Sequence, residues 1–228
     1  MIPIRDTIPS TRVPAVTYLL IAANLGLFFY EVSLGENLPP FLERHALIPA
    51  RFLGGPLSFR EILTPMTAMF LHAGWFHVLG NMLYLYIFGD NVEDTLGHGR
   101  FLLFYLACGV ASFAVQIGFQ PVSSVPNIGA SGAIAGVLGA YFFLFPRARV
   151  VTLLPLFIFF TVVEIPAVVF LGIWFLIQIL SGTISLGQAA AAGGVAWWAH
   201  VGGFLAGVVL LKLFTFRRRG RGPRRFSP

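Results

Sequence analysis

The stretch Gly129-Ala130-Ser131-Gly132-Ala133-Ile134-Ala135-Gly136-Val137-Leu138-Gly139 decides the fold that we expect for this chain. It puts one hydroxyl group at the start of an apolar helix whose faces carry small residues. Gly132, Gly136 and Ala140 recur every four residues, a spacing that lets a second helix approach backbone to backbone. The pattern therefore predicts a close helix–helix contact that begins beside Ser131.

A second run of small residues supplies a candidate partner helix. Ala199, Gly203 and Gly207 have the same spacing, and His200 follows the first of them. If the two helices pack together, Ser131 and His200 meet inside a bilayer. Ser131 also has a simpler interpretation, because serines in small-residue patterns commonly serve helix packing. An intramembrane histidine, by contrast, is costly to bury and is a functional candidate by default.

The composition is that of a membrane protein. The chain has 228 residues, of which 57% are hydrophobic and 11% charged, with a mean hydropathy of +0.83. Soluble domains average about 25% charged residues. The length leaves room for roughly six spans of about 20 residues with short loops. The single cysteine, Cys108, excludes an internal disulfide.

The formal net charge of +6 comes from one end of the chain. Six of the fifteen basic residues are arginines between positions 217 and 225, so the other nine balance the nine acidic residues. A basic segment after an apolar helix favours a cytoplasmic location and attracts anionic lipid. No aromatic residues interleave these arginines as a stacking surface for bases would require, so we expect no nucleic-acid partner.

The hydropathy pattern predicts an all-α bundle of six transmembrane spans. We expect a cytoplasmic N-terminal segment without a cleavable signal over 1–13, a membrane domain over 14–216 and a basic cytoplasmic tail over 217–228. The stretch 150–181 is too long for one span and too short for two, so 150–163 is expected to lie in the interface. The loop 33–60 is interpreted in the same way. The expected spans are 14–32, 74–92, 100–119, 131–146, 164–180 and 196–214.

The basic residues outside the tail support this count. With both termini in the cytoplasm, only three arginines fall on the outer side, which agrees with the positive-inside rule. Spans two, four and six then all enter the membrane from the outer face. His77, Ser131 and His200 each lie in the first turns of such a span, so three distant polar side chains reach a similar depth. The outer arginines are Arg44, Arg51 and Arg60, and the inner basic residues before the tail are Arg5, Arg12, Arg100, Arg147, Arg149 and Lys212.

These polar groups can be combined into a site for acyl transfer. A serine hydroxyl needs a base to take its proton, and His200 is the base that could reach Ser131. No acidic residue lies nearby on the fourth or sixth span, so we expect a Ser-His dyad. His77 and Asn81 are spaced i, i+4, and with the backbone N–H of Ser131 they offer donors to an oxyanion. The alternative for His77 and Asn81 is interhelical hydrogen bonding.

Metal and cofactor chemistry has no support in the sequence. His72 and His77 are five residues apart, no His-Glu-x-x-His motif occurs, and the acidic residues of the second span lie at its far end. We therefore expect neither a metal nor a cofactor. His72 lies in the loop before that span, where it is either solvated or structural.

Three motifs resemble those of the rhomboid intramembrane serine proteases. They are the GxSG pattern around Ser131, the HxxxN pattern from His77 to Asn81, and the histidine-glycine motif at His200, in an order and spacing similar to the family's. The resemblance implies Ser131 as nucleophile, His200 as general base, and His77, Asn81 and the Ser131 amide as an oxyanion hole. It further implies structural roles for Arg60 and Glu93. The turn into the helix and the small-residue spacing predict structural roles for Gly129, Gly132, Gly136, Gly203 and Gly207.

The resemblance also implies a substrate and a location. The expected activity is endopeptidase cleavage of single-span membrane proteins in or near the outer end of their helices, by a multi-pass protein of a bacterial or archaeal cell membrane. The alternative is a non-catalytic rhomboid-like protein that binds transmembrane helices, although inactive relatives lose the serine or the histidine and both are present here. Position 135 is Ala, where some members carry a tyrosine that stacks on the histidine, so the way in which His200 is held stays open.

Overall fold

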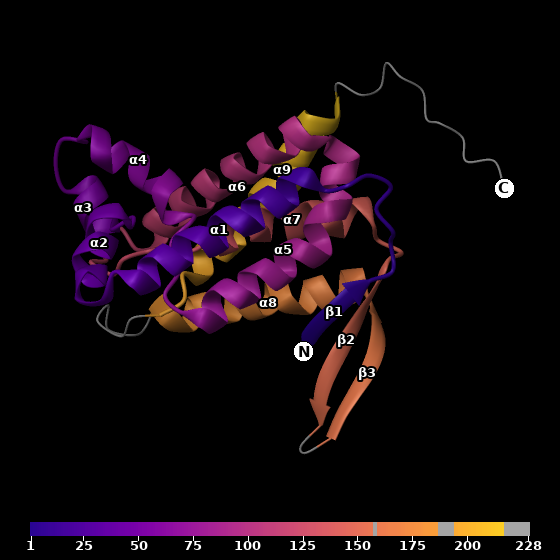
Figure 1. Cartoon of the computed structure of the whole chain (residues 1–228). Coiled ribbons are helices and arrows are strands. Elements are labelled where there is room, and N and C mark those ends of the chain that lie inside the picture. Colours follow the sequence, from indigo (N-terminus) through magenta and orange to yellow (C-terminus); the bar gives the residue numbers. More distant parts are fainter. Residues whose placement is uncertain (157–158, 187–193, 217–228) are drawn as a thin grey trace.

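The computed structural model describes residues 1–156, 159–186 and 194–216, which form a helical bundle with a small sheet at one end (Figure 1). The short helices α2 to α4 lie at the opposite end. The helices are α1 (Ala15–Ser33), α2 (Leu38–His45), α3 (Pro49–Leu53), α4 (Phe59–Ala68), α5 (Trp75–Leu96), α6 (His98–Phe119), α7 (Ser131–Leu144), α8 (Ala167–Leu186) and α9 (Trp197–Phe216), with a 3₁₀ turn η1 (Gly35–Asn37). The strands are β1 (Ile2–Asp6), β2 (Arg149–Leu156) and β3 (Phe159–Pro166).

Among the described residues, six helices correspond in chain order to the six expected spans: α1, α5, α6, α7, α8 and α9. Within the described residues, four of them (α1, α6, α8 and α9) are long and apolar enough to cross a membrane. Helix α7 is apolar but has only 14 residues, and α5 carries three acidic residues near its C-terminal end. The chain is thus a helical membrane bundle, while the count of six spans and the cytoplasmic termini stay predictions. The basic tail falls outside the described residues.

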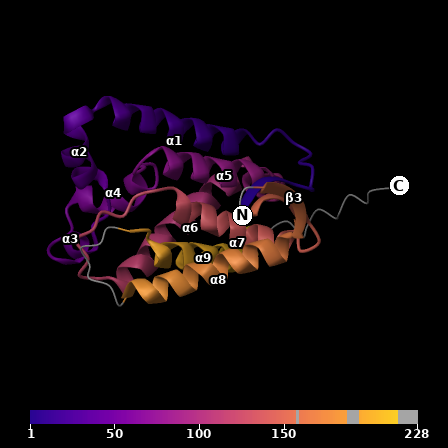
Figure 2. The same ribbon diagram turned by 90° about the horizontal axis from the view of Figure 1, so that it is seen from below.

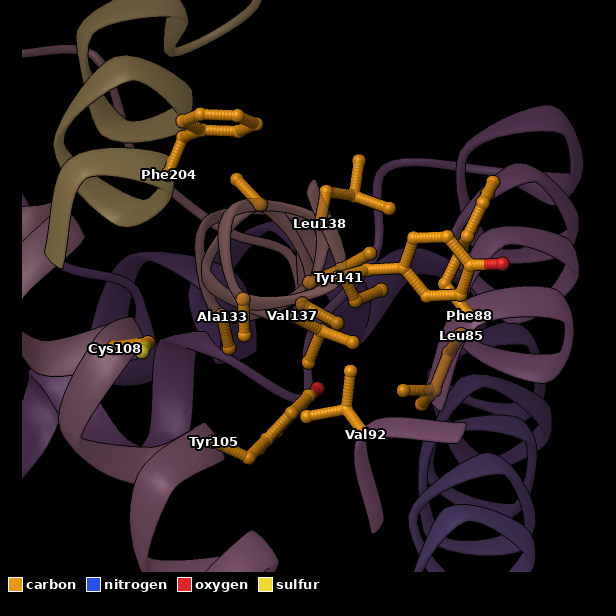
Figure 3. Close-up of a cluster of buried hydrophobic side chains, with 14 of the residues drawn as sticks. Leu85, Phe88, Val92, Tyr105, Cys108, Ala133, Val137, Leu138, Tyr141 and Phe204 are labelled. Carbon is orange, nitrogen blue, oxygen red and sulfur yellow. The ribbon is translucent and has the colours of Figure 1, made fainter. Parts of the chain in front are cut away.

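Helix α7 lies at the centre of the bundle. Figure 2 shows α1 and α5 on one side and α8 and α9 on the other, with α6 and α7 between them. Figure 3 shows labelled side chains of α5, α6 and α9 around α7, among them Phe88, Tyr105 and Phe204. Phe88 and Tyr105 are fully buried. A central apolar helix with no lipid contact on most faces is a protected place for a polar side chain.

The two runs of small residues bring α7 and α9 into backbone contact. A Cβ atom added to Gly203 would lie 2.0 Å from the carbonyl oxygen of Gly132, and one added to Gly207 would lie 2.0 Å from that of Gly136. No real side chain tolerates such distances, so only glycine fits at these crossings. The close approach fixes the depth of α9 against α7.

The structure corrects the expectation of an all-α fold. Strands β1, β2 and β3 form an antiparallel sheet in that order, and the segments 1–13 and 150–163 both contribute to it. The second segment forms a hairpin because β-branched and aromatic residues dominate it, and Pro155 disfavours a helix. The fifth span therefore begins at Ala167, after Pro166, and not at Glu164, which pairs with Val151 inside the sheet.

The carboxylate of Glu93 ties α5 to the start of α1. Its Oε2 accepts hydrogen bonds from the backbone N–H and the hydroxyl of Thr17, each at 2.7 Å. Its Oε1 accepts from the N–H of Val16 at 2.9 Å and contacts His98 Nδ1 at 2.5 Å. The first N–H groups of a helix have no partner within the helix and lie at its positive end. The buried Glu93 therefore caps α1 from a neighbouring helix.

The segment between α1 and α5 is a folded cap and not a free linker. Arg51 of α3 links the short helices of this segment. Its Nη2 donates to the carbonyl oxygen of Ala46 at 2.8 Å, and its Nε donates to Glu61 Oε2 at 3.1 Å. Arg51 also donates to the carbonyl oxygen of Glu43. One arginine thus connects α2, α3 and α4. The expected location of this cap in the membrane interface stays a prediction.

Candidate active site

The cap fixes the loop that leads into α7. Leu47 and Asn127 exchange two backbone hydrogen bonds, of 3.2 and 2.8 Å, and the N–H of Gly129 donates to the carbonyl oxygen of Ala68 at 2.8 Å. Both contacts lie within four residues of Ser131. The cap segment and the loop before α7 therefore hold Ser131 from two sides.

Three helices begin at the end of the bundle that carries the cap. His77 is the third residue of α5, Ser131 is the first of α7, and His200 is the fourth of α9. The sheet lies at the other end (Figure 1). The similar depth expected for these three side chains agrees with where the helices place them.

The serine and the histidine are in hydrogen-bond contact. Ser131 Oγ lies 2.8 Å from His200 Nε2. His200 is 8% exposed and Ser131 is half-buried, so the contact is largely shielded from solvent yet reachable at the hydroxyl. The glycine crossings described above bring α9 close enough for this contact. A contact of this kind allows a histidine to accept the proton of a serine hydroxyl.

The other ring nitrogen of His200 has a partner that the sequence interpretation missed. His200 Nδ1 lies 2.8 Å from Oε1 of Gln178, a buried residue of α8. The rings of Trp174 and Trp197 lie 5.9 and 6.2 Å from the imidazole, centroid to centroid. A single amide inside an apolar span was the available signal, because intramembrane polar residues are rare and usually functional.

His77 lies directly beside the serine loop. Its Nδ1 accepts a hydrogen bond from the backbone N–H of Ala73 at 3.3 Å, so the neutral ring carries its proton on Nε2. A Cβ atom on Gly129 would lie 2.7 Å from that Nε2 and 3.7 Å from Ser131 Oγ. The position that a Cβ of residue 129 would take is therefore next to both His77 Nε2 and the Ser131 hydroxyl, and glycine leaves it empty.

Asn81 follows His77 by one turn of α5 and is also buried. Its Nδ2 has no hydrogen-bond partner among the described residues. An unpaired buried donor is costly in a folded protein, and it needs an acceptor from water or from a ligand. Asn81 thus has a free donor on the same helix face as His77.

His72 is structural and not solvated, which decides between the two alternatives left open by the sequence. It is 2% exposed, its ring lies 5.1 Å from that of His77, and both ring nitrogens lack partners among the described residues. Burial, and to a lesser extent the neighbouring His77, lower the pKa of His72 to about 4. At neutral pH His72 is therefore an uncharged neighbour of the site.

The remaining candidates lie outside the immediate site. Arg60 is about half exposed and pairs with Glu61 at 3.1 Å in the cap, and Glu93 caps α1 near the opposite end of α5. Among the residues that the structure describes, no group of three His, Cys, Asp or Glu side chains is placed to hold a metal ion.

Comparison with known proteins identifies relatives of the chain. A family model described as a rhomboid domain matches residues 60–217. The chain is 37% identical to the rhomboid protease GluP of Bacillus subtilis over 136 residues, which is 58% of this chain and 25% of that protein. It is 28% identical to the mitochondrial rhomboid protein 1 of Saccharomyces cerevisiae over 211 residues, 87% of this chain and 56% of that one.

A further relative is the human mitochondrial presenilin-associated rhomboid-like protein, which is 33% identical over 145 residues, 61% of this chain and 36% of that protein. The chain thus spans between a quarter and just over half of the length of these relatives.

Proposed function

The chain belongs to the rhomboid family, and from this premise we propose that it is an intramembrane serine endopeptidase that works with a Ser131–His200 dyad. The observation that carries the proposal is the 2.8 Å contact between Ser131 Oγ and His200 Nε2 at the start of a buried apolar helix. It makes Ser131 a nucleophile and His200 its general base.

The reaction follows from these positions. Ser131 Oγ attacks the carbonyl carbon of the scissile peptide bond while its proton passes to His200 Nε2. The tetrahedral intermediate then collapses, the C–N bond breaks, and His200 gives the proton to the leaving amine. A water molecule, deprotonated by His200, attacks the resulting ester and releases the second product and the free Ser131 hydroxyl.

The oxyanion of the intermediate needs donors, and three converge on this end of the bundle. The N–H of Ser131 lies in the first turn of α7, where helix N–H groups have no partner in the helix. His77 contributes Nε2–H and Asn81 contributes its unpaired Nδ2–H. Preorganised donors of this kind stabilise the transition state more than the substrate.

The length of α7 supports cleavage below the outer membrane surface. A helix of 14 residues is about 21 Å long, whereas the hydrocarbon core is about 30 Å thick. Ser131 therefore lies at a recessed depth, under the cap. A substrate helix hides its carbonyl groups in backbone hydrogen bonds, so it must unwind locally before attack. We propose single-span membrane proteins with weak helix formers near the cut as substrates.

The topology belongs to the same proposal. We propose six spans with both termini in the cytoplasm, because Arg12, Arg100 and Arg149 lie at the sheet end and Arg44, Arg51 and Arg60 lie in the cap. This places the site at the outer face and the sheet at the inner face. The protein is an integral membrane protein, and a bacterial or archaeal cell membrane stays the predicted location. Anionic lipid is the partner proposed for the basic tail.

The test uses the full chain in detergent and in liposomes with a fluorophosphonate probe and a model single-span substrate. The native protein should be labelled and should cut the substrate, and Ser131→Ala and His200→Ala should each abolish both reactions because the dyad works as a unit. Ser112→Ala is the matched control, since Ser112 is a buried helical serine that bonds only to the carbonyl oxygen of Gly109 among the described residues. If the native protein binds the substrate helix but neither labels nor cuts, it is the non-catalytic helix-binding alternative.

A further inference from the structure

The orientation of the Gln178 amide is set by its own helix. Gln178 Nε2 lies 3.0 Å from the carbonyl oxygen of Trp174, one turn earlier in α8. A backbone carbonyl can only accept a hydrogen bond, so the group facing Trp174 must be the NH₂ of the amide. The carbonyl oxygen Oε1 of Gln178 is then the atom that faces His200 Nδ1 at 2.8 Å.

This orientation determines which nitrogen of His200 carries the proton. Oε1 can only accept, so Nδ1 must be the protonated nitrogen, and in the neutral ring Nε2 is left with a lone pair. That lone pair faces Ser131 Oγ at 2.8 Å, and the hydroxyl therefore donates to it. A single chain of hydrogen bonds runs from the Trp174 carbonyl through Gln178 and His200 to Ser131.

We propose that Gln178 is a positioning residue that holds His200 in the tautomer able to accept the proton of Ser131. The inference rests on the proposed function, since only a general base requires that tautomer. It also answers how the ring is held with Ala at position 135. Gln178 does so from α8, on the other side of His200 from Ser131.

An amide suits this position better than a carboxylate. Gln178 is 4% exposed and lies within a membrane-spanning helix, where a buried charge is costly unless it is fully paired. The amide supplies the acceptor for Nδ1–H without a net charge, and its own NH₂ is satisfied by Trp174. No acidic side chain on α8 or α9 competes for Nδ1 among the described residues. The arrangement performs the orienting part of a triad with neutral groups.

The first experiment reads the tautomer by ¹⁵N NMR of histidine in the full-length protein at pH 8. The chain has five histidines, and comparison with His200→Ala assigns the signals of His200. The native protein should show Nδ1 protonated and Nε2 unprotonated. Gln178→Met keeps the side-chain length but removes the acceptor, so the Nε2–H form should appear. A native His200 protonated on Nε2, or an unchanged pattern in Gln178→Met, would overturn the proposal.

The second experiment measures steady-state kinetics on the model substrate. Gln178→Met should lower kcat about tenfold, the value of one lost hydrogen bond, with KM changed less than twofold. The matched control is Thr183→Val, because Thr183 lies on the same helix and bonds only to the carbonyl oxygen of Ile179 among the described residues. An unchanged kcat in Gln178→Met, or an equal loss in Thr183→Val, would show that Gln178 serves helix packing only.

The two experiments separate the proposals. If the native protein neither labels nor cuts while the NMR pattern depends on Gln178, the proposed function fails and the assignment of the tautomer stands. If the protein cuts the substrate and the tautomer of His200 is the same in Gln178→Met, the proposed function stands and the positioning role of Gln178 fails.

Discussion

At the scale of single residues, Gly129 is required by two independent constraints. Its φ of +121° lies in a region that residues with a side chain rarely adopt, and an added Cβ would press on the Nε2 edge of His77. The clash would be with the Nε2–H of His77, which we propose as a donor to the oxyanion. Gly129 therefore determines the turn into α7 and, under the proposed function, the access of His77 to the substrate oxygen.

We expect Gly129→Ala to fold but to lower kcat roughly 10²- to 10³-fold, as the loss of one oxyanion donor does. Gly118→Ala is the matched control, because a Cβ at Gly118 meets nothing within 4 Å. Steady-state kinetics on the model substrate compare kcat of the two variants. The same Gly129→Ala substitution in a His77→Ala background tests whether the loss of kcat acts through His77. If Gly129→Ala costs as much with His77 replaced as with it present, the damage does not act through His77.

The same scale shows where sequence reasoning succeeds. Two runs of small residues predict the pairing of Ser131 with His200, because the period of such a run directly predicts a helix contact. The sequence does not predict Gln178 as a partner of His200, because no motif surrounds it and its role depends on the rotation of α8 against α9. Whether an amide points at a neighbour or at lipid is decided by tertiary packing, which composition and spacing do not encode.

At the scale of elements, the start of α1 depends on a carboxylate from α5. Without Glu93 the N–H groups of Val16 and Thr17 would be left without their acceptor in a buried place. Each unpaired buried donor costs about 1–3 kcal/mol. We therefore expect Glu93→Ala to destabilise the protein by roughly 2–5 kcal/mol.

Denaturant unfolding in detergent measures this difference, and Asp94→Ala is the matched control. Asp94 is the next residue of α5 and bonds to Thr11 and Arg12 near the surface, so its loss should cost less than about 1 kcal/mol. Probe labelling of Ser131 in folded Glu93→Ala should be unchanged, since Glu93 and the start of α1 lie far from the site. Equal destabilisation by the two variants would refute the special role of Glu93.

The sheet is the element that the sequence interpretation missed. The sequence predicts the long helices to within a few residues at most ends, because a long apolar run is a local signal. The strands 149–156 and 159–166 are also apolar, and hydropathy does not distinguish such residues from an interfacial segment followed by a membrane span. What makes them a sheet is partly their partner β1, nearly 150 residues away in the chain. Pairing over that separation has no periodic signature.

At the scale of the whole molecule, Asp6 joins the sheet to the centre of the bundle. The hydroxyl of Tyr141, near the end of α7, donates to Asp6 Oδ2. Burial raises the pKa of Asp6 from 3.8 to about 6, the charge of Asp90 acts in the same direction, and the Tyr141 hydrogen bond opposes both. The folded protein therefore binds the Asp6 proton more tightly than the unfolded chain does.

The sign of the resulting pH dependence follows by linkage. Because the folded pKa lies above the unfolded one, the stabilisation from the protonated carboxyl is fully present below about pH 4 and is lost as pH rises through about 6. Asp6→Asn is neutral at every pH and keeps an acceptor for Tyr141. We expect its Tm to exceed that of the native protein at pH 7.5 and the difference to vanish near pH 4. Thermal unfolding in detergent across this range is the measurement. Because Asp90 acts on the Asp6 carboxyl, the Tm difference reports Asp6 together with its coupling to Asp90. A difference that does not depend on pH would mean that folding does not raise the pKa of Asp6.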